Sequence, residues 1–201
     1  MRNLVLTLGL ACLAGVPVAA QNGLPARQPI SMAGIERVAG KVDSVFIDRT
    51  AREHTVAGGD WVSYLAARLG AVPIPEPSGI MVTVDSSKIL VVGKMSDLPP
   101  ETRDLFGPVA MFVSPDTPLE AEVVMAPTGP GAVRFVLTTI RVNGYPIPES
   151  IMSRFLAQVG ARYPVLTRTG RELLVGIPAD GRIALVQNGV RLWVVDSVSS
   201  R

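Results

Sequence analysis

The hydrophobic positions of residues 57–70 recur at the spacing of an amphipathic helix. They are Trp61, Val62, Leu65, Ala66 and Leu69. Asp60 is the expected N-cap, and Gly70 is placed to end the helix. The sequence therefore predicts one short helix that buries an apolar face.

A second helix is predicted within "NGYPIPESIMSRFLAQVG", residues 143–160. Asn143-Gly144 is a turn signal, and Pro148 stands near the first helical position, where its missing N–H is harmless. The apolar face that follows consists of Ile151, Met152, Phe155, Leu156 and Val159.

Runs of aliphatic, β-branched and alternating residues predict about eight or nine strands. The expected strands lie in 41–50, 80–84, 89–94, 109–114, 119–127, 132–144, 164–178 and 180–196. Residues 71–79 hold three prolines and are expected to form an extended loop, and residues 96–108 another loop with one possible helical turn. Since short turns join the strands, we expect an antiparallel sheet and an α+β fold.

The two predicted helices can be superposed at an offset of 90 residues, and the strand at 87–92 matches 181–186 at an offset of 94. This similarity indicates a possible internal duplication of a helix and a hairpin. Two such units would place two short helices on one shared, strongly curved antiparallel sheet.

The first 20 residues have the pattern of a secretory signal peptide, with Arg2, an apolar run and small residues that predict cleavage after Ala20. Lipidation at Cys12 is disfavoured because Gly9 stands where a lipoprotein signal has leucine. We interpret residues 21–40 as a flexible leader and residues 41–198 as one α+β domain. The expected location is the periplasm or the exterior of the cell.

The composition narrows the possible functions. The chain is 48% hydrophobic, 18% charged and 5% aromatic, with a formal net charge of +2. No Lys/Arg cluster indicates nucleic-acid binding, and Cys12 is the sole cysteine. The expected core is aliphatic and free of disulfides, and membrane association would be peripheral at most.

Residues with catalytic potential are few. His54 is the sole histidine and has no surrounding signature of a triad or of a zinc site. Glu120 and Glu122 share one face of a predicted strand, and side chains in such an arrangement usually face solvent. We expect a protein that is not an enzyme and needs no metal or cofactor, with a hydrolase of unrecognised type as the remote alternative.

The remaining candidate site is apolar. If the helices and the sheet do not close completely, a groove between them could hold an acyl chain. Its expected lining is Trp61, Leu65, Leu69, Ile151, Met152, Phe155, Leu156 and Val159. The same residues would equally serve as an ordinary core between helices and sheet.

The segment "LTTIRVNGYPIPESIMSRFLAQVG" followed by "GIPADGRIALVQNGVRL" resembles bacterial periplasmic lipid-binding envelope proteins. These are the mycobacterial phospholipid-binding, AsmA-like and TULIP-like groups. The resemblance covers about residues 40–198 and implies a helix on a strongly curved sheet with a lipid or other apolar ligand between them. The alternative is an envelope assembly module, whose exposed strand edge at 109–114 would meet a partner protein.

Overall fold

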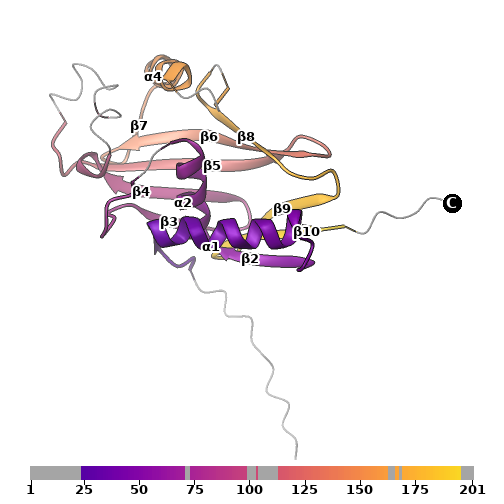
Figure 1. Ribbon diagram of the computed structural model, residues 1–201. Coiled ribbons are helices and arrows are strands. Elements are labelled where there is room, and N and C mark those ends of the chain that lie inside the picture. Colours follow the sequence, from indigo (N-terminus) through magenta and orange to yellow (C-terminus); the bar gives the residue numbers. More distant parts are fainter. Residues whose placement is uncertain are drawn as a thin grey trace, which may run out of the picture.

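The computed structural model describes residues 24–70, 73–98, 103, 113–162, 166–167 and 169–195. These residues form an α+β fold with three helices, a seven-stranded antiparallel sheet and a three-stranded antiparallel sheet (Figure 1). The helices are α1 (Met32–Val42), α2 (Gly58–Arg68) and α4 (Glu149–Arg162). The predicted signal peptide, Cys12 and the first part of the predicted leader lie outside the described residues.

The larger sheet has the strand order β1-β3-β4-β5-β6-β7, with β8 also paired to β6. Its strands are β1 (Gln28–Pro29), β3 (Met81–Val84), β4 (Lys88–Lys94), β5 (Pro118–Pro127), β6 (Ala132–Val142), β7 (Tyr145–Pro146) and β8 (Glu172–Gly176). The predicted hairpin at 80–94 and the predicted strands at 119–127 and 132–144 are confirmed.

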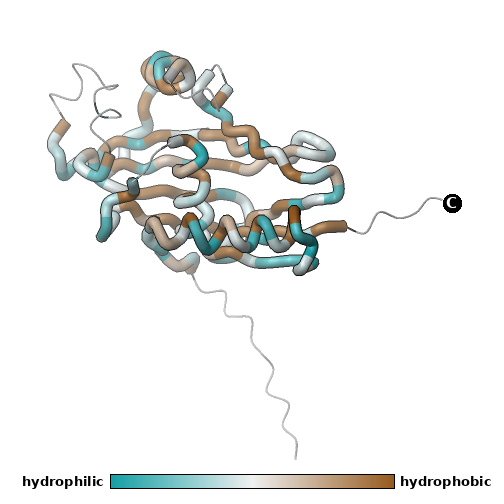
Figure 2. Tube along the Cα trace, in the orientation of Figure 1, coloured by the Kyte–Doolittle hydropathy of each residue, from teal (hydrophilic) through white to brown (hydrophobic). Residues whose placement is uncertain are grey.

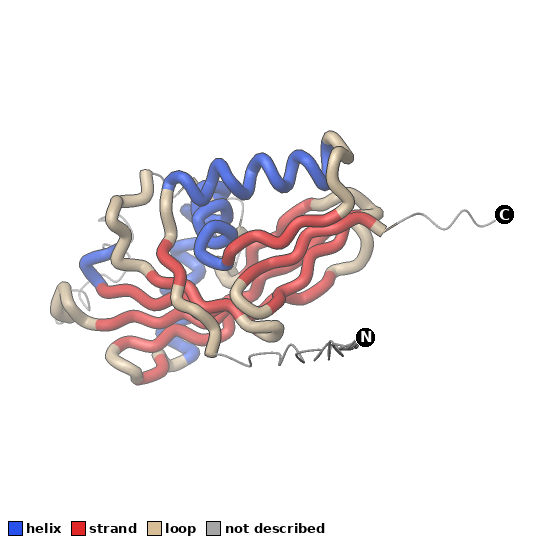
Figure 3. Tube along the Cα trace, turned by 90° about the horizontal axis from the view of Figure 1, so that it is seen from below, coloured by secondary structure: helices blue, strands red, loops and turns tan. Residues whose placement is uncertain are grey.

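The smaller sheet has the order β2-β10-β9. Its strands are β2 (Glu53–Ala57), β9 (Gly181–Val186) and β10 (Gly189–Val194). The prediction of one strongly curved sheet is therefore wrong, because the strands divide between two sheets and neither is strongly curled. A second sheet encloses the far side of the core, as the two groups of strands in Figure 3 show.

Residues 28–40, predicted to be a flexible leader, instead form β1 and most of α1. The predicted strand at 41–50 is also wrong, since the chain continues from α1 into a π-helical turn, Asp43–Ile47. Ser31 caps α1 by accepting a hydrogen bond from the N–H of Gly34 at 3.0 Å. Val38 and Val45 are fully buried, so this segment is part of the core.

Helices α1 and α2 cross closely at a glycine. A Cβ atom on Gly34 would lie 2.8 Å from Oδ1 of Asp60 and 3.1 Å from Oγ of Ser63. Ser63 is fully buried and satisfied, because its hydroxyl donates to the carbonyl of Gly59 and accepts from the N–H of Ser31. Asp60, predicted to be the N-cap, lies in the first turn of α2 and pairs with Arg37.

Two turns use residues with positive φ. Asn143 and Gly144, with φ of 52° and 78°, join β6 to β7, as in a type I′ hairpin turn. Asn188, with φ of 64°, lies in the turn between β9 and β10. This second turn connects the two sheets, because the N–H of Asn188 donates to the carbonyl of Val84 and its own carbonyl accepts from Gly58.

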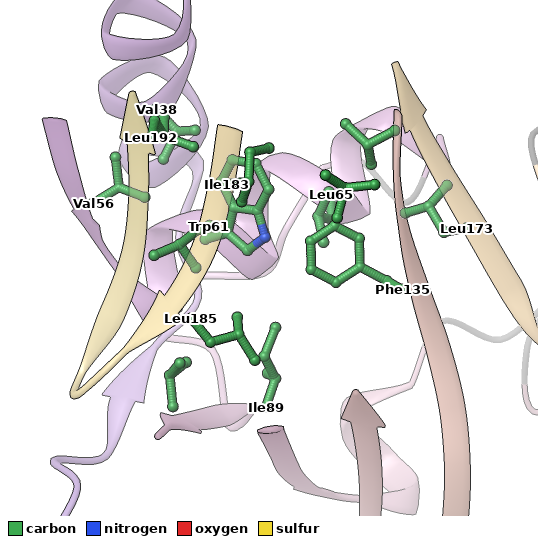
Figure 4. Close-up of a cluster of buried hydrophobic side chains, with 14 of the residues drawn as sticks. Val38, Val56, Trp61, Leu65, Ile89, Phe135, Leu173, Ile183, Leu185 and Leu192 are labelled. Atoms are coloured by element: carbon green, nitrogen blue, oxygen red, sulfur yellow. The ribbon is translucent and has the colours of Figure 1, made fainter. Parts of the chain in front are cut away.

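The core lies between the two sheets and is covered by α1 and α2. Trp61 is 1% exposed and lies between side chains of both sheets, with its ring 6.0 Å from that of Phe135 (Figure 4). Val190 and Leu192 of β10 are fully buried in the same core. The central strands carry long hydrophobic stretches, whereas α4, at the edge of the fold, has hydrophobic and hydrophilic residues side by side (Figure 2).

Candidate ligand-binding groove

An apolar groove of about 410 Å³ lies between α2, α4 and one face of the seven-stranded sheet. Most of its lining side chains are apolar. They are Val62, Leu65, Ala66, Leu69, Ile80, Ile89, Val91, Leu98, Leu119, Ala121, Val123, Phe135, Leu137, Ile140, Phe155, Leu156, Val159, Leu166 and Leu173. Gly93, Lys94, Glu120, Gly170 and Arg171 complete the lining. The volume falls within the range of about 300–1,000 Å³ that is usual for small-molecule sites.

The floor of the groove follows from strand alternation. Ile89 and Val91 of β4 and Ala121 and Val123 of β5 point to the same face, because side chains two residues apart share a side of the sheet. The charged side chains of Lys88 and Glu122, which alternate with them, point to the opposite face. The alternating pattern at 119–127 thus supplies an apolar floor on one side and charges on the other.

A β-bulge keeps the floor apolar along β6. The pairing between β5 and β6 shifts at Glu122/Val123, so that Leu137 pairs with Val123 but Ile140 pairs with Ala121. The extra residue on β6 is Thr138, whose hydroxyl donates to the carbonyl of Glu122 at 3.1 Å. Without this bulge, Leu137 and Ile140 would point to opposite faces of the sheet.

The walls come from the two predicted helices. Val62, Leu65, Ala66 and Leu69 lie at i, i+3, i+4 and i+7 on α2, the spacing that places side chains on one face. On α4 the corresponding set is Phe155, Leu156 and Val159.

Two glycines bring the second half of α4 against the loop before β8. A Cβ atom on Gly170 would lie 1.7 Å from the carbonyl oxygen of Leu156, and one on Gly160 would lie 2.7 Å from the N of Gly170. Gly170 also has φ of 65°, a conformation that disfavours other residues. Close backbone contact at this point therefore fixes the distance of α4 from the sheet edge.

An ion pair between Glu149 and Arg171 holds the first turn of α4. The pKa of Glu149 is lowered, first by the hydrogen bond from the Ser153 hydroxyl and then by the hydrogen bond from Arg171. Glu149 thus remains ionised and paired at neutral pH. Arg171 also lines the groove, so the same side chain closes one edge of it.

The other charged groups near the groove are paired with side chains of opposite charge. Lys94 pairs with Asp116 at 2.9 Å, and this hydrogen bond is the main cause of its raised pKa. Glu120 lies within 3.8 Å of Arg141, and Glu122 pairs with Lys88 at 2.9 Å.

The structure brings five of the eight predicted residues into the groove lining: Leu65, Leu69, Phe155, Leu156 and Val159. Trp61 lies instead in the core between the sheets. Met152 is 4% exposed and does not line the groove, and Ile151 is 53% exposed and points elsewhere.

A second hollow, of about 390 Å³, adjoins the groove on the other side of Phe155. Phe155 lines both. The remaining lining residues are Met95, Val113, Val142, Tyr145, Pro146, Ile147, Pro148, Ile151, Arg154 and Gln158. Ile151, which the apolar pattern placed with the groove-facing residues, belongs to this hollow.

The strand residues of the floor, such as Val91, Ala121 and Ile140, were not among the predicted site residues. The alternation of apolar and charged residues in 80–94 and 119–127 could have identified them. It predicts that the apolar face of these strands is covered by other elements of the fold. The pairing shift on β6 has no such signal in the sequence.

The residues considered for hydrolysis are not brought together. His54 lies on β2 of the smaller sheet, opposite Leu192, whereas Glu120 and Glu122 lie on β5 of the larger sheet. In the described part of the chain, no three His, Cys, Asp or Glu residues are grouped as a metal site would require. Of the predicted strand edge at 109–114, only residues 113–114 are described.

The two possible repeat units occupy different positions in the fold. After α2, the hairpin β3–β4 joins the larger sheet, whereas after α4 the chain first forms β8 in that sheet and then the hairpin β9–β10 in the smaller one. The expectation that both units share one sheet is therefore wrong.

No family model, curated protein or solved structure matches this chain. No helix within the described ranges combines the length and the apolar character needed to cross a membrane.

Proposed function

We propose that the protein binds one acyl chain, or an apolar ligand of similar size, in the groove between α2, α4 and the seven-stranded sheet, and carries out no chemistry on it. The observation that carries this proposal is an apolar groove of about 410 Å³ bounded by two amphipathic helices. The signal peptide predicted in residues 1–20 supports an activity in the cell envelope or outside the cell.

The volume of the groove favours a single chain. A methylene group occupies about the same liquid volume as a water molecule, roughly 30 Å³, so the groove accommodates about fourteen methylenes. Each buried methylene stabilises the complex by about 0.8 kcal/mol. A lining with so few polar groups offers binding energy to almost any aliphatic chain, and selectivity would come from length.

The first experiment is native mass spectrometry of the purified full chain, with extraction and identification of any co-purifying lipid. We expect an adduct with the mass of a single-chain or other apolar molecule. The purified protein should also bind a fluorescent fatty acid added in the absence of vesicles.

A matched pair of variants on β5 separates groove binding from nonspecific binding. Ala121→Phe adds an aromatic ring to the floor, whereas Ala126→Phe adds the same ring to the opposite face of the same strand. We expect the first variant to lose fluorescent fatty acid binding and the second to retain it. Equal binding by both folded variants would refute the proposed site.

A further inference from the structure

We propose that the exposed surface formed by Tyr145, Pro146, Pro148, Ile151 and Arg154, here called the α4 patch, docks on a membrane containing anionic lipid. All five residues line the second hollow, near the start of α4. The inference rests on the proposed function in one respect, since it identifies the point where the ligand would leave the bilayer and enter the protein.

The first observation is the apolar exposure of this patch. The side chains of Tyr145 and Ile151 are 75% and 53% exposed, and both belong to the lining of the same hollow. Pro146 and Pro148 lie between them in sequence and are also exposed. The other large hydrophobic residues exposed in the described part of the chain, such as Ile47 and Leu174, lie on other elements.

The second observation is charge. Arg154 is exposed and lines the second hollow, and within the described part of the chain its guanidinium has no hydrogen-bond or ion-pair partner. The acidic residue in the first turn of α4, Glu149, is already paired with Arg171. A cation beside apolar side chains is complementary to a surface of acyl chains and anionic head groups.

The residue types also fit an interface between lipid and water. Tyrosine has an apolar ring and a polar hydroxyl, and it is enriched at this depth of a bilayer. Arginine can place its aliphatic part among apolar groups while its charged end reaches the phosphates. The patch therefore matches a bilayer surface in both polarity and charge.

The third observation is continuity with the groove. Phe155 lines the groove on one side and the second hollow on the other. Val142 and Leu119 pair across β5 and β6, and they line the hollow and the groove respectively. A chain that enters from the α4 patch would thus meet Phe155 before it reaches the groove.

The experiment measures co-flotation of the full chain with vesicles of phosphatidylcholine alone and with vesicles that also contain phosphatidylglycerol. We expect binding to the anionic vesicles. The double variant Tyr145→Ser/Ile151→Ser should lose it, and Arg154→Gln should weaken it about fivefold, which corresponds to the roughly 1 kcal/mol contributed by one basic residue near an anionic surface.

Two controls make the result specific. Leu174→Ser changes a residue of similar exposure, 55%, on β8, and Arg68→Gln removes another exposed cation. Both should bind vesicles as the wild type does. Equal losses in the control and patch variants, or a wild type that does not float with anionic vesicles, would overturn the docking surface.

Binding of the fluorescent fatty acid without vesicles separates this inference from the proposed function. The patch variants should retain it, because their substitutions lie outside the groove lining. A wild type that binds the fatty acid but no vesicles disproves the docking surface alone. A wild type that binds vesicles through the patch but no fatty acid disproves the groove function alone.

Discussion

The dimensions of the groove predict how affinity depends on ligand length. The perturbation is a series of saturated fatty acids, tested with the wild-type chain, in which each member differs from the next in methylene number. If the chain lies in the groove, affinity must increase with length until the groove is full.

The magnitude follows from the volume. A groove of about 410 Å³ holds about fourteen methylenes at roughly 30 Å³ each. Complete burial at about 0.8 kcal/mol per methylene increases affinity about fourfold for each added group. Since the groove meets solvent at the exposed side chain of Lys94, we expect a slope between about twofold and fourfold per methylene.

The assay is displacement of a fluorescent fatty acid, measured below the concentration at which the competitor forms micelles. The slope should flatten near fourteen carbons, by the estimate above. In Ala121→Leu, which partly fills the floor, the flattening should move to shorter chains. In Ala126→Leu, whose added carbons lie on the other face of β5, it should not move.

Two results would refute this reasoning. Affinity that does not depend on chain length would mean that the chain is not buried. Affinity that continues to increase at the same slope for chains far longer than about fourteen carbons would mean that the ligand occupies a larger space than this groove.

Three further predictions concern the scaffold. Gly170→Ala should displace α4 and abolish fatty acid binding, because the added Cβ would overlap a backbone carbonyl. The control Gly129→Ala is also at positive φ but has no atom within 4 Å of the added Cβ. It should lose only about 1–2 kcal/mol of stability and keep fatty acid binding. Trp61→Ala should lower the free energy of unfolding by about 3–5 kcal/mol in urea titration, whereas Trp61→Phe should cost less, since the indole N–H has no partner among the described residues. The hydrogen bond from the hydroxyl of Ser87 is the main cause of the lowered pKa of Asp85. Asp85→Ala should therefore lower the free energy of unfolding by the full amount above the unfolded-state pKa of about 3.9. This difference should vanish as the pH falls through the lower pKa of Asp85 in the folded state. A difference in stability that is the same at neutral and strongly acidic pH would contradict this assignment.

The sequence by itself was sufficient where local signals agree. The helical spacing in 57–70, the proline entry at 148 and the alternation in 80–94 and 119–127 gave α2, α4 and the central strands correctly. In each case the pattern of burial and the turn residues favour the same element.

Local signals failed between residues 28 and 50. Gly34 and Gly40 weaken the helical propensity of α1, and the β-branched residues after it favour a strand. Ile35, Val38, Val42 and Val45 nevertheless follow a helical repeat, and Ser31 is a good N-cap. The glycine at 34 is needed because α2 crosses at that point, a requirement that becomes visible when both helices are in place.

Only the tertiary structure determined how the strands are divided between the two sheets and which apolar residues line the groove. Trp61 and Leu65 lie one turn apart on α2 and both belong to the core, yet only Leu65 also lines the groove. The groove depends on the distance of α4 from the sheet, which the contact between Gly160 and Gly170 fixes from segments ten residues apart. Periodicity determines that a helix face will be covered, but which element covers it, and whether a gap remains, depends on contacts between distant parts of the chain.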